Sequence, residues 1–153
     1  MTAAFRIRPA TAADAGAVAG LAAGLAQSFA FSRASFDAHF PALLATGHAC
    51  LLVAVPGPGP GPEEDCLGYL LGFEHLTFYA NGRIAWAEEV LVRGDHRGQG
   101  VGRALMTAFE HWARERGCPL VALATRRAAP FYHALGYQDS AVYLRKVFDD
   151  ERG

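Results

Sequence analysis

The residues best suited to chemistry form a turn that is rich in glycine and arginine. Arg97, Gly98, Gly100 and Gly102 follow an apolar run, residues 90–92, and lead directly into a segment with helical apolar spacing. Glycine allows a ligand to approach the backbone closely, and the first turn of a helix presents unpaired N–H groups at the positive end of its dipole. We therefore expect this turn to bind a phosphorylated cofactor.

The spacing of this turn excludes the two commonest phosphate-binding motifs. No Gly-Lys pair occurs in the chain, so a Walker-type loop is absent. A dinucleotide-binding motif needs a third glycine three residues after the second, and counting from Gly98 and Gly100 this position is Arg103. The pattern Arg97-x-x-Gly100-x-Gly102 instead resembles the acetyl-CoA pyrophosphate signature of the GNAT N-acyltransferase superfamily. A surface turn that only joins a strand to a helix is the alternative.

A second motif lies downstream of an apolar run that predicts a buried strand. Phe131-Tyr132 is followed by three residues and then by Gly136-Tyr137, which resembles the later signature of the same superfamily. Pro130 suits the first turn of a short helix, and Gly136 suits the position just past its end. The two signatures in this order identify the chain as similar to the superfamily, although Phe131 also fits an ordinary core position.

The resemblance implies an α+β fold with α/β/α layers, in which a twisted, mixed, mostly antiparallel sheet is flanked by about four helices. It also implies acetyl-CoA as co-substrate, with no metal. The strand end would contact the acyl group and the pantetheine arm, and the turn would hold the pyrophosphate. The implied cofactor-binding residues are Val90, Leu91, Val92, Arg97, Gly98, Gln99, Gly100, Val101, Gly102, Arg103 and Phe131.

Two carboxylates occupy the end of a strand that is otherwise expected to be buried, where an unpaired charge is costly. Alternation predicts that Glu88 and Glu89 point to opposite faces of the sheet. Attack on a thioester needs a neutral amine, so a base or a water relay is required. By similarity to the Glu-Asp-x-x-Val pattern of diamine acetyltransferases, Glu88 contacts the acceptor amine or a water, and Glu89 is the second candidate for substrate binding. Structural ion pairs are the alternative.

Tyr132 matches the tyrosine that protonates the departing thiolate in the superfamily, and a core tyrosine is the alternative. The resemblance thus implies transfer of acetyl from acetyl-CoA to a primary amine of a small molecule, by direct attack in a ternary complex. Glu74, Glu88 and Glu89 suggest a cationic acceptor. A protein N-terminal or lysine acetyltransferase, a non-catalytic acyl-CoA-binding regulatory module and a general nucleotide-phosphate binder remain open.

The whole chain fits one acyl-CoA N-acyltransferase domain spanning residues 1–153. Its formal net charge of −1 provides no basic face for nucleic acid. No apolar run is long enough to span a membrane, and the start lacks the features of a signal peptide. Cys50, Cys66 and Cys118 fit buried, reduced thiols of a cytoplasmic protein. The histidines show no paired spacing typical of a metal site.

Local patterns predict the elements that must position these residues. Strands are expected at residues 5–8, 49–55, 66–76, 83–92, 120–124 and about 140–147, and helices at 11–25, within 29–46, from 101 to a cap at Gly117, and at 130–136. Asn81-Gly82 predicts a hairpin turn, and the Pro-Gly repeat at 56–62 an exposed hairpin loop. The apolar segment 141–148 suits either the core or the interface of a homodimer.

Overall fold

A computed structural model describes residues 4–25, 29–57 and 65–148. The chain divides into two compact units, Met1–Leu123 and Ala124–Gly153. The expected hairpin loop at 56–62 lies mostly outside the described residues, but the strands on either side of it do pair.

The first unit is built on one mixed sheet, as the sequence predicts. The strand order is β1-β2-β3-β4-β5, with antiparallel pairing except between β4 and β5, which are parallel. The turn between β3 and β4 has Asn81 at φ 58°, the left-handed conformation that the Asn-Gly pair predicts. The strands are β1 Phe5–Pro9, β2 Ala49–Pro56, β3 Gly68–Thr77, β4 Gly82–Val92 and β5 Val121–Leu123.

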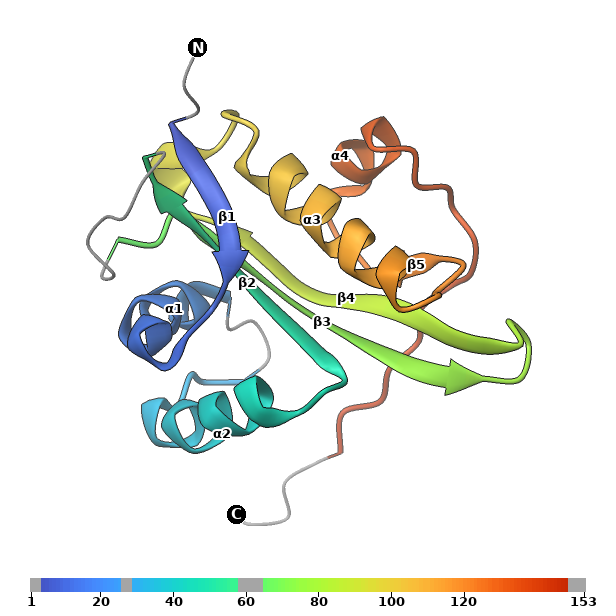
Figure 1. The fold of residues 1–153 in the computed structure, drawn as a ribbon, viewed down its shortest axis with the longest axis horizontal. Coiled ribbons are helices and arrows are strands. Elements are labelled where there is room, and N and C mark those ends of the chain that lie inside the picture. The colour runs from blue at the N-terminus through green and yellow to red at the C-terminus, as the bar shows by residue number, and fades with distance from the viewer. Residues whose placement is uncertain (1–3, 26–28, 58–64, 149–153) are drawn as a thin grey trace. The chain divides into compact units, whose positions relative to one another are not determined.

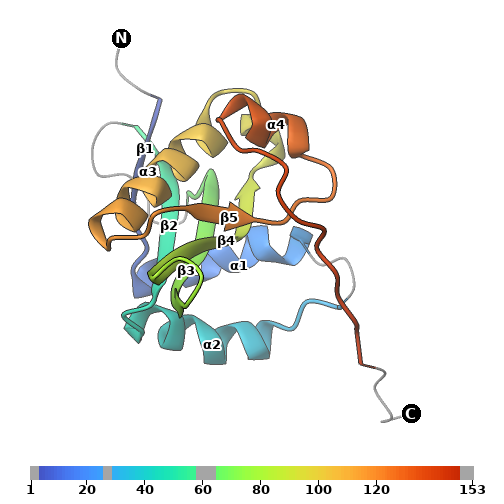
Figure 2. The ribbon, with the colours of Figure 1, turned by 90° about the vertical axis from the view of Figure 1, so that its right-hand side faces the viewer.

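Helices cover both faces of this sheet. Helices α1 (Ala15–Ala22) and α2 (Arg33–Ala45) lie on one face and α3 (Val101–Glu115) lies on the other (Figures 1 and 2). The turn before α1 is anchored by Asp14, whose carboxylate accepts the Thr11 N–H at 2.7 Å. This carboxylate also receives two hydrogen bonds from the Arg8 guanidinium, so β1 and the start of α1 are tied together.

Strand alternation divides the buried side chains between the two faces. On the α1/α2 face, Val53 and Tyr69 pack with Val18 of α1 and Phe40 of α2. On the α3 face, Gly68 and Gly72 of β3 leave room for the helix, since a Cβ at Gly68 would lie 3.3 Å from Val101 Cγ1. The helix buries its apolar stripe there, namely Val101, Leu105, Met106, Phe109 and Ala113.

Gly72 of β3 lies directly against α3. Its Cβ would overlap the Phe109 ring, which is fully buried, and would lie 3.1 Å from the Trp86 carbonyl oxygen. We expect Gly72→Ala to lower the free energy of unfolding by about 1–3 kcal/mol, because overpacking forces the ring or the strand to move. Urea denaturation checks this value. Gly20→Ala, at an exposed position of α1 where a Cβ meets nothing within 4 Å, should instead be neutral or stabilising. Equal losses in the two variants would contradict the packing argument.

The second unit contains α4, Ala129–Ala134, with Pro130 in its first turn and Gly136 at φ 95° just past its end, as predicted. The expected strand at 140–147 is wrong, because residues 140–148 form neither helix nor strand. Val142, Leu144 and Phe148 expose 82%, 84% and 85% of their surface. Apolar composition favours a strand only where a neighbouring strand can accept its hydrogen bonds, and the described ladders include no residue beyond Leu123.

The cysteines agree with the sequence prediction of buried, reduced thiols. Cys50, Cys66 and Cys118 are buried and free, and burial raises the pKa of the Cys50 thiol to about 12. No helix in the described part of the chain is both long and apolar enough to cross a membrane.

Candidate active site

A bulge interrupts β4 at the residues that the sequence singles out. Leu71 of β3 pairs with Glu89, whereas the next residue, Gly72, pairs with Ala87, so Glu88 is the extra residue. A bulge of this kind bends a strand and breaks its pairing, and bulges are common beside active sites. The strand therefore changes course just before residues 90–92, the predicted contact for the acyl group and the pantetheine arm.

On its other side, β4 loses its partner at the same point. The parallel ladder with β5 pairs Ala85, Trp86 and Ala87 and then ends at Leu123. From Glu88 to Val92, β4 has a strand neighbour on its β3 side but none on its β5 side among the described residues. Backbone groups facing that side are available to a ligand, since unpaired backbone N–H and C=O groups seek partners.

The glycine turn opens α3 in the way that the sequence predicts. Gly98 and Gly100 have φ of +77° and +87°, and Gly100 is the N-cap of the helix. The first helical hydrogen bond runs from the Ala104 amide to the Gly100 carbonyl at 3.0 Å. The amides of residues 101–103 therefore precede the first helical bond and lack a helical acceptor. They form the donor set of an anion site.

The space and charge around this turn suit a pyrophosphate. A Cβ placed on Gly98 or Gly100 would meet no atom within 4 Å, so the turn is open on that side. Arg97, Gln99 and Arg103 are all exposed there, and the Arg97 Nε lies 3.4 Å from the Val92 carbonyl oxygen at the end of β4. The residues present fit the phosphates of a CoA-type cofactor.

One acidic side chain lies in the turn but its charge is already paired. The Arg93 guanidinium donates to the Asp95 carboxylate at 2.7 Å, and His96 lies 2.9 Å from the same oxygen. Hydrogen bonds from Arg93 and then His96 lower the pKa of Asp95 to about 2. This pairing reduces the repulsion that a carboxylate would otherwise exert on a phosphate nearby.

The two carboxylates of the bulge have different surroundings. Glu88 is exposed and accepts a hydrogen bond from Trp86 Nε1 at 2.7 Å, whereas Glu89 is half-buried and accepts one from Tyr69 Oη at 2.8 Å. Glu89 pairs with Leu71 and Trp86 pairs with Phe73, so Glu89 and Trp86 share the α1/α2 face. The bulge shifts the alternation by one residue between Trp86 and Glu89, so the regular alternation that underlies the prediction of opposite faces is interrupted at Glu88.

Tyr69 contacts one of the candidate site residues, Glu89, and the sequence does not reveal this contact. It lies in an apolar strand, and its relation to Glu89 depends on the register between β3 and β4, including the bulge. A tyrosine in a strand otherwise predicts only core packing.

Tyr132 and Phe131 lie on α4 in the second unit. The Tyr132 ring is half-buried between two others, with ring centroids 4.9 Å from Phe131 and 5.9 Å from Tyr137, both in edge-on contact. Burial raises the pKa of the Tyr132 hydroxyl, so this group keeps its proton throughout the neutral range.

Glu74, the third carboxylate that suggested a cationic acceptor, is already neutralised within the protein. It is 4% exposed, and its oxygens lie 2.7 Å from Arg83 Nε, 2.9 Å from His48 Nδ1 and 3.5 Å from Arg116 Nη1. This ion-pair cluster joins β3 and β4 to the end of α3, so the charge of Glu74 is engaged by basic side chains of the protein itself.

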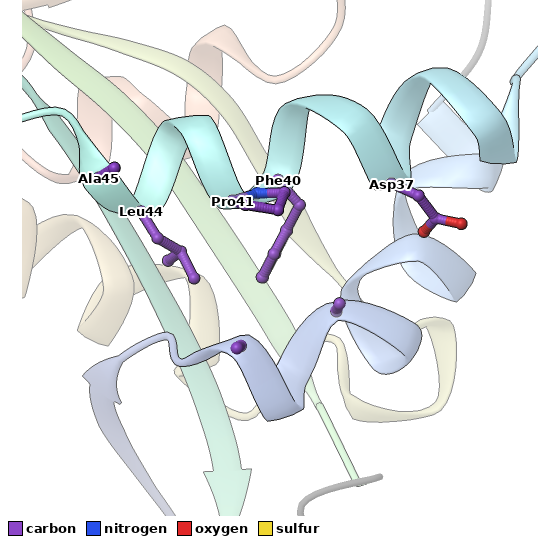
Figure 3. A pocket seen from close by; sticks show the side chains of 7 residues that line it. Asp37, Phe40, Pro41, Leu44 and Ala45 are labelled. Atoms are coloured by element: carbon purple, nitrogen blue, oxygen red, sulfur yellow. The ribbon is translucent and has the colours of Figure 1, made fainter.

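A cavity of about 310 Å³ lies elsewhere, between α1 and α2 (Figure 3). Phe40, Pro41 and Leu44 line it from α2, and Asp37 stands at one end, where it is paired with Arg33. None of the lining residues belongs to β4 or to the glycine turn, so this cavity is separate from the predicted site.

Comparison with known proteins agrees with this geometry. The sequence model of the acetyltransferase (GNAT) domain matches residues 61–139, which is just over half of the chain. The chain belongs to the GNAT acetyltransferase family. The matched region includes the bulge of β4, the glycine turn and α4, so the family assignment rests on the segment that carries the candidate site.

Individual GNAT relatives resemble parts of this chain. A thialysine N-epsilon-acetyltransferase of Bos taurus is 32% identical over 59% of this chain and 55% of its own length. An aminoglycoside N(6')-acetyltransferase of Klebsiella aerogenes is 47% identical over 33% of this chain and 38% of its own. The chain thus spans about half or less of these relatives' lengths. A solved structure described as a transcriptional regulator from Bacillus halodurans superposes with a TM-score of 0.80 at 26% identity, covering 94% of this chain and 99% of that one.

Proposed function

We propose that this GNAT chain transfers the acetyl group of acetyl-CoA to a primary amine of a small molecule. The observation that carries the proposal is that, among the described residues, β4 lacks a strand partner on its β5 side from Glu88 to Val92, next to the open glycine turn before α3. Both features offer backbone hydrogen-bond donors to one extended ligand. The strand segment would face the acyl group at one end of this ligand, and the turn would face the pyrophosphate at the other end.

Acetyl-CoA supplies an acyl group activated as a thioester, and the chain's task on this side is to hold it. The amides of residues 101–103 and the turn from Gly98 would bind the pyrophosphate, with Arg97 and Arg103 adding positive charge. Backbone groups of residues 90–92 would align the pantetheine arm and the acyl carbonyl.

On the acceptor side, the chain must bind a cationic amine and remove a proton from it. Glu88 is exposed enough to reach the amine or a water and act as the base, and Glu89 would contribute to binding. The relatives named for thialysine and for aminoglycosides support amines of this kind as acceptors.

The transfer would be direct, with Tyr132 protonating the departing thiolate. A proton donor suits this step, since the conjugate thiol has a pKa near 8.5 and the raised pKa of Tyr132 keeps its hydroxyl protonated. A covalent route through cysteine is disfavoured, because Cys50, Cys66 and Cys118 are buried and burial raises the pKa of each thiol.

A thiol-release screen tests the proposal. Purified protein and acetyl-CoA are mixed with thialysine, lysine, spermidine, kanamycin, streptothricin and a peptide with a free N-terminus, and release of CoA is followed with a thiol reagent. Release with one or more of the small amines is the expected result. Release with the peptide alone would indicate a protein acetyltransferase. No release with any amine, while calorimetry still detects CoA binding, would indicate a non-catalytic module.

We expect Glu88→Gln to lower turnover about tenfold at pH 7.5, because the amide cannot accept the proton. The deficit should shrink as the pH rises toward 10, since more of an alkyl amine of pKa near 10.4 is then already neutral. A pH–rate profile of kcat with the best small amine measures this. A deficit that is constant with pH would contradict the role as base, and Glu110→Gln on α3 is the matched control.

A further inference from the structure

Glu89 is a half-buried carboxylate that has no basic partner in the part of the chain that the structure describes. Within residues 4–25, 29–57 and 65–148, its hydrogen bond comes from the neutral Tyr69 hydroxyl, to Oε1, and no arginine, lysine or histidine pairs with it. Taking a carboxylate partly out of water is unfavourable unless a positive group compensates. Glu74, by contrast, has three basic side chains around it. A cationic ligand would satisfy Glu89.

Tyr69 is held more firmly than the carboxylate that it contacts. Its side chain is 1% exposed, and its ring packs in the core cluster with Val18, Phe40 and Val53. Tyr69 pairs with Leu91 and Glu89 with Leu71, so the hydrogen bond is a diagonal contact across β3 and β4 on the α1/α2 face. Burial, followed by the nearby charge of Glu89, raises the pKa of Tyr69, so the hydroxyl stays a donor.

We propose that Tyr69 is a positioning residue for the acceptor: its hydroxyl fixes the Glu89 carboxylate beside the bulge of β4, where Glu89 binds an ammonium group of the amine. This inference rests on the proposed function. It assigns binding of the ammonium group to Glu89 and acceptance of the proton to Glu88, so the two adjacent carboxylates have different roles. The hydrogen bond of Tyr69 occupies Oε1 of Glu89, and Oε2 remains for the ligand.

Such a division of roles predicts a change in KM rather than in kcat. Removing the Tyr69 hydroxyl leaves Glu89 charged but free to take other rotamers, so the ammonium group loses an aligned partner. We expect Tyr69→Phe to raise KM for the amine about tenfold, with kcat within about threefold of the parent and KM for acetyl-CoA unchanged. Glu89→Gln should raise KM for the amine at least as much.

A double-mutant cycle separates positioning from a structural role. Steady-state kinetics with the best amine of the screen are measured for the parent, Tyr69→Phe, Glu89→Gln and the double variant, with Glu115→Gln, an exposed residue of α3, as the control. If Tyr69 acts through Glu89, the double variant should have the same KM as Glu89→Gln alone. Additive effects, or a Tyr69→Phe variant with normal KM and only a lower melting temperature, would overturn the proposal.

If the proposed acetyl transfer does not occur, the experiments give results that differ from those expected if only the role of Tyr69 is wrong. If the parent releases no thiol with any amine, calorimetric titration with spermidine and with kanamycin in the presence of CoA replaces kinetics. Binding to the parent that weakens about tenfold in Tyr69→Phe would support the positioning role in a non-catalytic protein. No binding of either amine to the parent would overturn both proposals. Turnover with an unchanged KM in Tyr69→Phe would overturn only the inference about Tyr69.

Discussion

Replacing Tyr132 by Phe should lower kcat about 100-fold while leaving the affinity for acetyl-CoA unchanged. A positioned proton donor contributes a factor of this size when it stabilises a departing anion. The substitution keeps the ring and therefore its edge-on contacts with Phe131 and Tyr137, so only the hydroxyl is lost. Steady-state kinetics with the best amine, together with calorimetry of CoA binding, measures the two quantities.

The pH dependence gives a second check of this role. Burial raises the pKa of Tyr132 above its ordinary value near 10, so the donor form persists up to pH 10 and is lost only above that value. The parent should therefore lose almost no activity through this group between pH 7 and 9. Tyr79→Phe, at a tyrosine with 72% exposure in the hairpin turn, is the control. An unchanged kcat in Tyr132→Phe would refute the role as acid.

Gly100→Ala should weaken CoA binding about tenfold. Gly100 has φ of +87°, and a residue with a Cβ pays about 1–2 kcal/mol to hold this left-handed conformation. A rotation that relieves the strain would move the first amides of α3, which are the expected donors to the pyrophosphate. A tenfold change corresponds to about 1.4 kcal/mol, comparable with one hydrogen bond to a charged group.

The other end of the same helix provides a matched control. Gly117 has φ of +78°, and a Cβ there, as at Gly100, would meet no atom within 4 Å. Gly117→Ala should therefore cost similar stability in urea denaturation but leave the Kd for CoA unchanged. If both variants weaken CoA binding equally, the effect is a general loss of stability and the turn is not the site.

Features that depend on a few neighbouring residues could be predicted from the sequence. Asn81-Gly82 predicts the hairpin because only certain residues tolerate its positive φ, and the glycines of the turn predict the start of α3 for the same reason. The capping function of Asp14 likewise follows from its spacing to Thr11. Of these features, the glycine turn and the start of α3 carry the expected pyrophosphate-binding part of the candidate site.

Features that depend on distant pairing could not be predicted in this way. The bulge at Glu88 appears only when β3 and β4 are aligned, and it interrupts the alternation from which the faces of the two carboxylates are predicted. The hydrogen bonds between Tyr69 and Glu89 and between Arg116 and Glu74 join residues that are far apart in the sequence, so no local pattern predicts them. Residues 140–148 have the composition of a strand, but composition cannot supply a ladder partner.

The bulge of β4 also limits how this protein can change during evolution. Because one residue is unpaired there, deleting a single residue between Ala87 and Leu91 would restore regular pairing with β3 and remove the bend that the bulge introduces just before residues 90–92. Replacements at Glu88 or Glu89 leave the bulge in place. Acceptor preference can therefore diverge through substitutions here, whereas the length of this segment should be held constant among descendants that still use the turn.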